Sequence, residues 1–138
     1  VTYHDPCHMG RHMNHYEVDM EGKKMWKGAF VQVDKPGLYE TPRNVLKAIP
    51  GIQFKEMYRN RDNSFCCGAG GGIKSSYPDV ALETAKTRVR EAEGVDGVQK
   101  IVTPCPFCVT NLGDGAKALG SKMEVVDLIQ LVDQALKK

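Results

Sequence analysis

Apolar residues follow two kinds of spacing along the chain, and the two kinds take turns. Short runs of β-branched or alternating apolar residues predict strands, and apolar residues three or four positions apart predict amphipathic helices. The predicted strands are a short one that begins at residue 1 and ends at Pro6, then 52–58, 100–103 and 123–126. The predicted helices cover 41–49, 78–93, the residues after Cys108 up to Leu119, and the residues after Asp127.

This strand–helix order, repeated four times, predicts an α/β fold. Strands that alternate with helices pair in parallel, because each helix crosses back over the sheet before the next strand begins. We therefore expect a single domain with a roughly four-stranded parallel sheet covered by helices. A length of 138 residues suits one such domain.

Residues at the predicted helix ends support these boundaries. Thr41 is placed to cap the first helix, and Gly120 to end the third. Asp127 and Gln130 resemble a capping box for the last helix. Gly115 lies inside the third helix, where a glycine is expected to weaken it.

Residues 13–38 interrupt the order with a stretch in which neither spacing is sustained. We interpret 13–38 as a long insertion after strand one, because unstructured connections of this length are uncommon inside a compact domain. The chain also starts at Val1 without a methionine, in what reads as a strand. We therefore expect 1–138 to be one domain of a longer protein.

Composition and charge exclude several classes of function. The chain is 41% hydrophobic and 26% charged, with a net charge of +2, which is too small to argue for binding to nucleic acid. No apolar run reaches the roughly 18–20 residues that span a bilayer, and no signal peptide is recognisable. These features predict a cytoplasmic location, or one at the cytoplasmic face of a membrane complex.

The five cysteines occur in three places, each just after a predicted strand. Cys7 follows the first strand, Cys66 and Cys67 follow the second, and Cys105 and Cys108 follow the third. Sites in parallel sheets form at the carboxyl ends of the strands, so we expect all five thiols to meet at one edge. An odd number of clustered cysteines favours metal or redox chemistry over a disulfide framework.

The spacing leaves three kinds of chemistry open. Cys105 and Cys108, two residues apart, suit a zinc site, a dithiol redox pair or an iron–sulfur cluster. The adjacent Cys66 and Cys67 cannot comfortably share one tetrahedral ion, but they can bind different irons of a cluster. Closed zinc sites and cubane clusters each take four ligands, so five thiols indicate unusual ligation or one additional reactive thiol.

Glycines and one histidine complete the predicted site. Gly68, Gly70 and Gly71 let the backbone approach a bulky inorganic group and direct N–H groups at its sulfurs. They do not match the dinucleotide-binding pattern, because Ile73 breaks its spacing. His8, beside Cys7, is a candidate hydrogen-bond donor or proton carrier. The other histidines, His4, His12 and His15, are expected to be packing or surface residues.

These motifs resemble a known family. Cys7, Cys66-Cys67-Gly68 and, 36 residues later (after positions 69 to 104), Cys105-Pro-Phe-Cys108 are similar to the cysteine-rich CCG domain. That domain occurs in heterodisulfide reductases and related iron–sulfur oxidoreductases. The glycine run is most similar to the D-type catalytic subunit and to the K subunit of the sulfite-reduction membrane complex.

The resemblance implies an oxidoreductase that reduces a disulfide, or oxidises two thiols, at a non-cubane 4Fe-4S cluster. The metal ligands implied are all five cysteines. The predicted catalytic residues are Cys66, Cys67 and His8, the last because of its position beside Cys7. The implied partners are a small thiol cofactor or small protein as disulfide substrate, and other iron–sulfur domains or subunits as electron donors. A zinc-stabilised structural or interaction module is the alternative. The gap from Cys7 to Cys66 (58 residues, positions 8 to 65) is longer than usual in the family, and residues 13–38 carry the excess.

Overall fold

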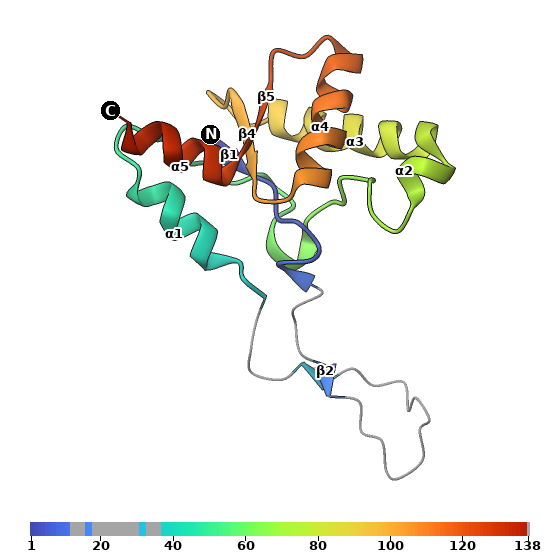
Figure 1. Cartoon of the computed structure of the whole chain (residues 1–138), viewed down its shortest axis with the longest axis horizontal. Helices are drawn as coiled ribbons and strands as arrows, with labels where there is room; N and C mark the ends of the chain where they lie inside the picture. Colours follow the sequence, from blue (N-terminus) through green and yellow to red (C-terminus); the bar gives the residue numbers. More distant parts are fainter. Residues whose placement is uncertain (12–15, 18–30, 33–36, 138) are drawn as a thin grey trace.

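A computed structural model describes residues 1–11, 16–17, 31–32 and 37–137. Its central sheet has three parallel strands in the order β1-β4-β5: β1 (Thr2–Tyr3), β4 (Lys100–Thr103) and β5 (Glu124–Asp127). β4 lies in the middle, with Ile101 paired to Thr2 on one side and to Val125 on the other. The α/β class and the parallel pairing are confirmed (Figure 1).

The prediction of a fourth strand at 52–58 is wrong. This segment makes only one strand-like exchange, in which the Val1 amino group donates to the carbonyl of Gln53 and the Lys55 amide donates to the carbonyl of Val1. Alternating burial is present, with Met57 buried and Tyr58 exposed, which explains the sequence pattern. The neighbouring β1 is only two residues long, too short to support a regular ladder beside it.

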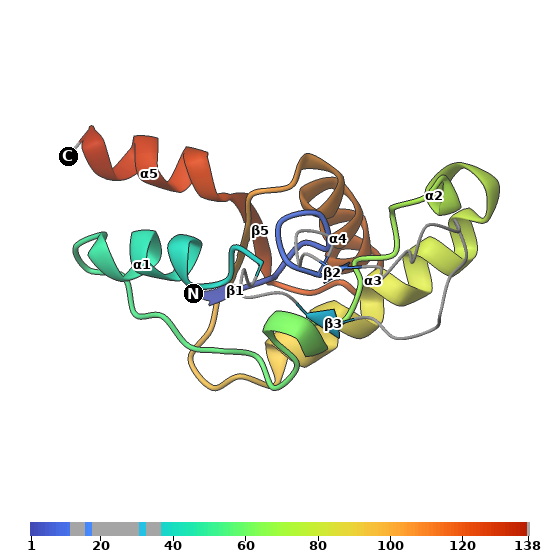
Figure 2. The same cartoon turned by 90° about the horizontal axis from the view of Figure 1, so that it is seen from below.

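Helices cover both faces of the sheet (Figures 1 and 2). On one face α3 packs against α4 and contacts the short α2; α1 and α5 lie on the other. The helix bounds are α1 (Glu40–Ala48), α2 (Ile73–Ser76), α3 (Pro78–Glu93), α4 (Pro106–Leu119) and α5 (Leu128–Leu136). A 3-10 turn covers Arg61–Asn63.

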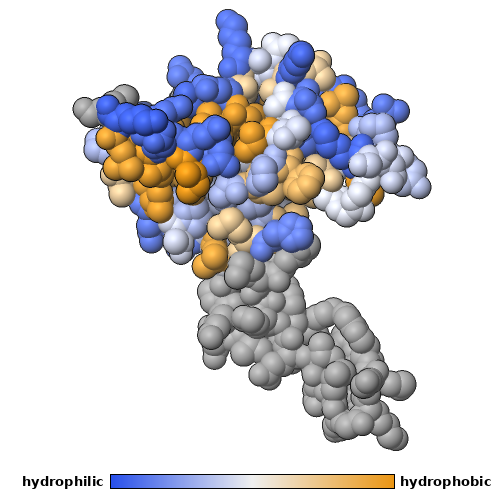
Figure 3. Space-filling model, viewed as in Figure 1, coloured by the Kyte–Doolittle hydropathy of each residue, from blue (hydrophilic) through white to orange (hydrophobic). Residues whose placement is uncertain are grey.

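The two faces of the sheet bury separate apolar clusters. The cluster under α3 and α4 includes Val89, Ile101, Leu112 and the two buried cysteines. The cluster under α1 and α5 includes Tyr3, Leu46, Val102, Val126 and Leu131. Figure 3 shows further apolar residues gathered on the side where α5 lies, and Ile129 and Leu136 of that helix are exposed.

The predicted helix ends are mostly confirmed. Asp127 is the N-cap of α5, where its carboxylate accepts a hydrogen bond of 2.8 Å from the amide of Ile129. Gly120 ends α4 in the left-handed conformation, with φ of 65°. The prediction that Thr41 caps the first helix is wrong, because α1 begins one residue earlier and Tyr39 is its N-cap.

Gly115 has a packing role that the sequence did not reveal. A Cβ at this position would lie 2.9 Å from the Cβ of Ala85 and 3.0 Å from backbone atoms of Ala85 and Lys86. Only a glycine therefore allows α4 to approach α3 this closely. The cost of a glycine inside a helix is offset by the contact between the two helices that frame the cysteines.

The predicted insertion lies mostly outside the described residues. Of 13–38, the structure describes β2 (Tyr16–Glu17), which pairs antiparallel with β3 (Val31–Gln32), and residues 37–38. Where the chain returns, the amide of Leu38 donates to the carbonyl of Met9 at 2.7 Å. The stretch therefore leaves and re-enters the domain at one point. No helix in the described part of the chain is long and apolar enough to span a bilayer.

Candidate metal centre

Two of the predicted ligands form a buried pair. The sulfur of Cys108, in the first turn of α4, lies 3.3 Å from the sulfur of Cys67. Both side chains are only 4% exposed. The pair exists because β4 leads directly into α4, as the sequence predicted, while the double-cysteine segment crosses the same edge of the sheet.

The second pair lies closer to solvent. Cys7 and Cys66 are half-buried, and their thiols share a hydrogen bond. The guanidinium of Arg11 lies 3.5 Å from the Cys7 sulfur and also donates to the carbonyl of Asp62. The positive charge of Arg11 lowers the pKa of this thiol and so opposes part of the rise that the hydrogen bond to Cys66 and burial cause.

The two pairs are joined into one group of sulfurs. A hydrogen bond links the thiols of Cys66 and Cys67, so the contacts run from Cys7 through Cys66 and Cys67 to Cys108. Cys105 is the N-cap of α4, three residues before Cys108, and it packs against the same core cluster. The structure thus brings four of the five predicted ligands into contact and places the fifth at the start of the same helix.

The first glycine after the doublet adopts a conformation that other residues disfavour. Gly68 has φ of 89°, and a Cβ there would lie 2.7 Å from the side chain of Thr84 and 2.8 Å from the carbonyl of Ala81. Its amide donates to the sulfur of Cys66 at 3.3 Å, and the amide of Ala69 donates to Cys67. Backbone N–H groups therefore face the sulfurs here, as expected for a site that stabilises negative charge.

Gly70 and Gly71 lie farther along this turn and are exposed. Gly71 has φ of 62°, whereas a Cβ on either residue would meet no atom within 4 Å. The conformation of Gly71 suits the turn into α2, and the role of both glycines in cofactor binding stays a prediction.

A histidine that the sequence did not single out lies among the sulfurs. His4 is 1% exposed, and one of its ring nitrogens lies within 4.8 Å of the sulfurs of Cys67 and Cys108. Burial, with the nearby charges of Arg88 and Arg11, lowers the pKa of His4 to about 3, so the ring is neutral. His8 is exposed, and its predicted catalytic role stays a prediction. Residue type alone could not separate the two, because they flank the same cysteine.

Two of the thiols, those of Cys7 and Cys67, resist ionisation because their pKa values are raised. The hydrogen bond to Cys66, followed by burial, raises the pKa of Cys7. The hydrogen bond to Cys108 is the main cause that raises the pKa of Cys67 to about 11. A metal or cluster must displace these protons, so its binding is coupled to proton release.

The residues present fit a thiophilic metal group. Cysteine sulfurs are the usual ligands of iron–sulfur clusters and of structural zinc. Two buried polar atoms at the carboxyl ends of β1 and β4, His4 Nε2 and Thr103 Oγ1, have no hydrogen-bond partner among the described residues. Native proteins rarely leave such atoms unsatisfied, which supports a bound group at this edge.

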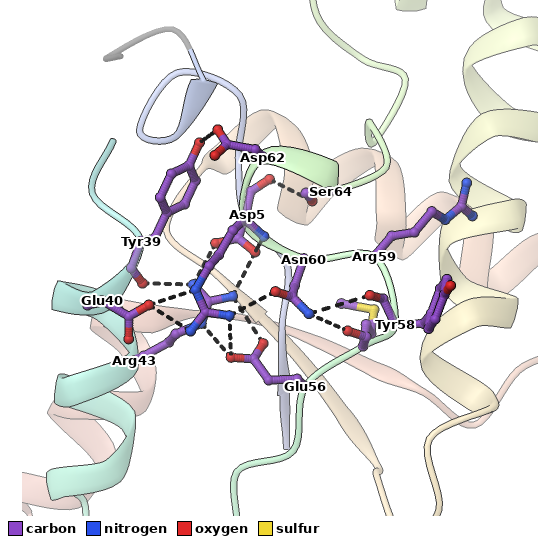
Figure 4. A network of polar contacts seen from close by, with 12 residues as sticks. Asp5, Tyr39, Glu40, Arg43, Glu56, Tyr58, Arg59, Asn60, Asp62 and Ser64 are labelled. Atoms are coloured by element: carbon purple, nitrogen blue, oxygen red, sulfur yellow. Dashed lines mark hydrogen bonds and ion pairs between the residues drawn. The ribbon is translucent and has the colours of Figure 1, made fainter. Parts of the chain in front are cut away.

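A network of buried charges fixes the segments that carry Cys7 and Cys66 (Figure 4). Arg43 of α1 is fully buried and donates to both carboxylate oxygens of Asp5, at 2.7 and 2.8 Å, and to Glu56 at 2.6 and 3.0 Å. Asp5 also accepts a hydrogen bond from the amide of Arg61, at 2.8 Å. This last bond holds Arg61 at φ of 53°, a conformation that is rare for a side-chain-bearing residue.

One amide side chain fixes the carbonyl of the double-cysteine segment. Asn111 of α4 is 1% exposed and donates to the carbonyl of Cys67 at 2.7 Å and to that of Ala81 at 3.0 Å. Its own oxygen accepts from Lys74 at 2.7 Å. Asn111 had no sequence signal, because its partners lie 30 to 44 positions away.

A family model described as "Cysteine-rich domain" matches residues 1–113. The chain belongs to this cysteine-rich domain family. The family resemblance expected from the sequence is thereby confirmed. The matched range contains all five cysteines and His4.

The curated relatives are longer proteins. The chain is 43% identical over 136 residues to the D subunit of the dihydromethanophenazine:CoB–CoM heterodisulfide reductase of Methanosarcina acetivorans, covering 99% of the chain and 27% of the relative. It is 33% identical to the probable iron–sulfur-binding oxidoreductase FadF of Bacillus subtilis, covering 99% of the chain and 16% of the relative. It is 32% identical to the B subunit of the fumarate reductase (CoM/CoB) of Methanothermobacter marburgensis, covering 98% and 22%.

The chain thus spans about a quarter or less of the length of these relatives. They are iron–sulfur proteins or oxidoreductase subunits by name. No solved structure matches the chain significantly.

Proposed function

We propose that this chain is the iron–sulfur domain of an oxidoreductase that reduces a disulfide, or oxidises two thiols in the reverse direction. The observation that carries the proposal is the run of contacts from Cys7 through Cys66 and Cys67 to Cys108, with Cys105 at the start of the same helix. Five free thiols in one place exceed the need of a closed zinc site.

The proposed cofactor is a 4Fe-4S cluster of non-cubane type, held by the five cysteines. Such a cluster, when bound, supplies electrons one at a time at a potential set by its surroundings. Adjacent residues suit a cluster with more than one iron, because the Cys66 and Cys67 sulfurs face different neighbours, Cys7 and Cys108. The amides of Gly68 and Ala69 would stabilise the charge on these sulfurs.

The protein's own contribution is to bind the cluster, to shield it from water and to orient the substrate. Burial of Cys67 and Cys108 excludes water from one side, whereas the half-buried Cys7 and Cys66 leave the other side open to a substrate. The substrate's sulfur–sulfur bond breaks when it accepts two electrons and two protons, which gives two thiols. Arg11, beside Cys7, provides a positive charge for an anionic substrate.

The names of the relatives support the substrate class and the partners. One relative is part of a CoB–CoM heterodisulfide reductase, and another is part of a CoM/CoB fumarate reductase. We accordingly propose a disulfide of small thiol cofactors as substrate, ahead of a small protein, and further iron–sulfur domains or subunits as electron donors.

The second candidate is a zinc-stabilised structural or interaction module. It is favoured by the grouping of His4, Cys67 and Cys108, whose ligand atoms lie within 4.8 Å of one another. This candidate predicts one zinc, no acid-labile sulfide and no disulfide reductase activity.

Metal analysis of the anaerobically purified protein separates the two candidates. We expect iron and acid-labile sulfide in equal amounts, an electron paramagnetic resonance signal that changes when a thiol is added, and reduction of a small-molecule disulfide. Cys66→Ser and Cys67→Ser are each expected to change this signal and to lower the activity at least tenfold. Ser75→Ala, an equally small change at an exposed position a few residues along the chain, serves as the control.

Zinc without iron, persisting after anaerobic reconstitution, contradicts the proposal. So does an unchanged spectrum with full activity in both cysteine variants.

A further inference from the structure

The two ring nitrogens of His4 have different surroundings. Nδ1 accepts a hydrogen bond of 3.1 Å from Nε of Arg88. Nε2 is buried and has no hydrogen-bond partner among the described residues. A ring nitrogen of His4 lies within 4.8 Å of the sulfurs of Cys67 and Cys108. Because Nδ1 is taken by Arg88, Nε2 is the nitrogen left to interact with the sulfurs.

Arg88 cannot turn away from this contact. Its side chain is fully buried, and three of its four remaining N–H donors are used: Nη1 donates to the carbonyl of Arg59 at 2.8 Å and to Glu91 at 2.9 Å, and Nη2 donates to Ser64 at 3.3 Å. A guanidinium keeps its charge and has no acceptor atom. Arg88 therefore always presents an N–H to His4.

The Arg88 contact fixes the position of the proton on the neutral ring. Since Nδ1 faces a donor, it must keep its lone pair, and the single proton of the neutral imidazole is then on Nε2. A histidine that binds a metal through Nε2 usually has its proton on Nδ1 and donates it to a carboxylate or a carbonyl. His4 has the reverse arrangement, so it is built as a donor and not as a ligand.

We propose that His4 donates an Nε2–H hydrogen bond to the Cys67–Cys108 sulfurs, and that Arg88 is the positioning residue that fixes the required tautomer. This inference rests on the proposed function only in that the sulfurs hold a metal group. It explains why the buried Arg88 donates to a histidine, and why His4 Nε2 has no nitrogen or oxygen acceptor among the described residues. Hydrogen bonds to cluster sulfurs raise the reduction potential, because they stabilise the negative charge gained on reduction.

Pulsed electron–nuclear double resonance on the iron-loaded enzyme, with ¹⁵N-labelled histidine, tests the donor directly and without a mutation. We expect a weak ¹⁵N coupling together with a proton coupling that disappears in D₂O. A strong coupling typical of a directly bonded nitrogen would overturn the proposal, as would the absence of both couplings. If the enzyme holds zinc instead, ¹⁵N chemical shifts of His4 answer the same question: a protonated Nε2 supports the proposal, and a metal-bound Nε2 overturns it.

Variants test the two roles separately. His4→Phe is expected to shift the reduction potential of the cluster to more negative values and to remove both couplings, and His4→Gln, which keeps an N–H near the position of Nε2, to restore part of the potential. Arg88→Lys is expected to give a smaller negative shift because the tautomer is no longer fixed. Arg90→Lys, an exposed arginine on the same helix, is the control and should leave the potential unchanged.

Unchanged potentials in both His4→Phe and Arg88→Lys, with the cluster present, would refute the tuning role. This failure is distinct from that of the proposed function, because it is measured on the cluster itself. An enzyme that contains iron and shows the His4 couplings but reduces no disulfide would contradict only the proposed reaction.

Discussion

Cys67 and Cys108 lie against an apolar core, whereas the segments carrying Cys7 and Cys66 are joined by buried charges. On the first side the support is the packing of α3 on α4, with residues such as Val89 and Leu112 fully buried. On the second side it is Arg43, which holds Asp5 and Glu56. The difference shows how one site combines a dry, closely packed wall with an open side that the chain must fix by directional bonds.

The two kinds of support respond differently to substitution. Apolar packing depends on volume, so small errors of shape cost modest amounts of free energy. A buried ion pair depends on both members being present, because removing one leaves an uncompensated charge out of water. The polar side is therefore expected to be the more fragile of the two.

The largest expected effect is the loss of Arg43. Arg43→Met removes five hydrogen bonds, to Asp5, Glu56 and the carbonyl of Tyr39, and the contact of the guanidinium with the ring of Tyr3 at 5.1 Å. We expect the free energy of unfolding to fall by about 3–5 kcal/mol, because the buried Asp5 carboxylate loses its counter-charge. Urea unfolding of the anaerobic protein, followed by circular dichroism, measures this change.

Lys137→Met is the matched control for Arg43→Met. It removes an ion pair with Asp133 in which the two side chains are 72% and 56% exposed, and it should cost less than about 0.5 kcal/mol. If the two variants were equally stable, the polar side would not depend on its buried charges.

The second prediction concerns the apolar side. Gly115→Ala places a methyl group 2.9 Å from the Cβ of Ala85, so α4 must move away from α3. We expect the free energy of unfolding to fall by about 1–3 kcal/mol through overpacking, and the Cys67–Cys108 pair to be disturbed. The measurements are urea unfolding and the stoichiometry of metal uptake.

Gly113→Ala provides the opposite expectation on the same helix. A Cβ at this position meets no atom within 4 Å, so the higher helix propensity of alanine should stabilise the protein by about 0.5–1 kcal/mol. Two glycines that look alike in the sequence thus differ in the sign of the effect. Equal stabilisation by both substitutions would show that the helices do not need the close approach.

The sequence predicted the apolar side well, and the reason is periodicity. The spacing of Ala85, Val89 and Ala92 marks the buried face of α3, and the run at 100–103 coincides with β4. Both signals are local, since one helix turn or one strand contains them. The expected meeting of the cysteines followed from topology alone.

The polar side could not be predicted, because its partners are far apart in the sequence. Arg43 and Asp5 are 38 positions apart, and Arg88 and His4 are 84 apart. An arginine on a helix usually indicates a solvated face, and nothing local distinguishes a buried one. The wrong prediction of a strand at 52–58 has the same origin. Whether an alternating segment pairs as a strand depends on the length of the strand beside it, here the two-residue β1, which is distant in the sequence.

The smallest expected effect is a pH dependence at Glu91 of α3, which binds Arg59 in the segment that leads to Cys66. Burial alone would raise the pKa of Glu91, but hydrogen bonds from the amide of Arg59 and from Arg88 outweigh it and lower the pKa below 4.5. A carboxylate with a lowered folded-state pKa stabilises the protein above its unfolded-state pKa, and this contribution is lost as the pH falls through the folded-state value. Glu91→Gln should therefore be less stable than the wild type at neutral pH, and the difference should shrink below about pH 4.5.

Urea unfolding across this pH range measures the difference. Glu93→Gln, which changes an exposed glutamate of the same helix, is the control, and its free energy of unfolding should stay within about 0.5 kcal/mol of the wild type throughout. A difference that stays constant with pH would mean that Glu91 acts by shape, and that the anchoring of Arg88 does not depend on its charge.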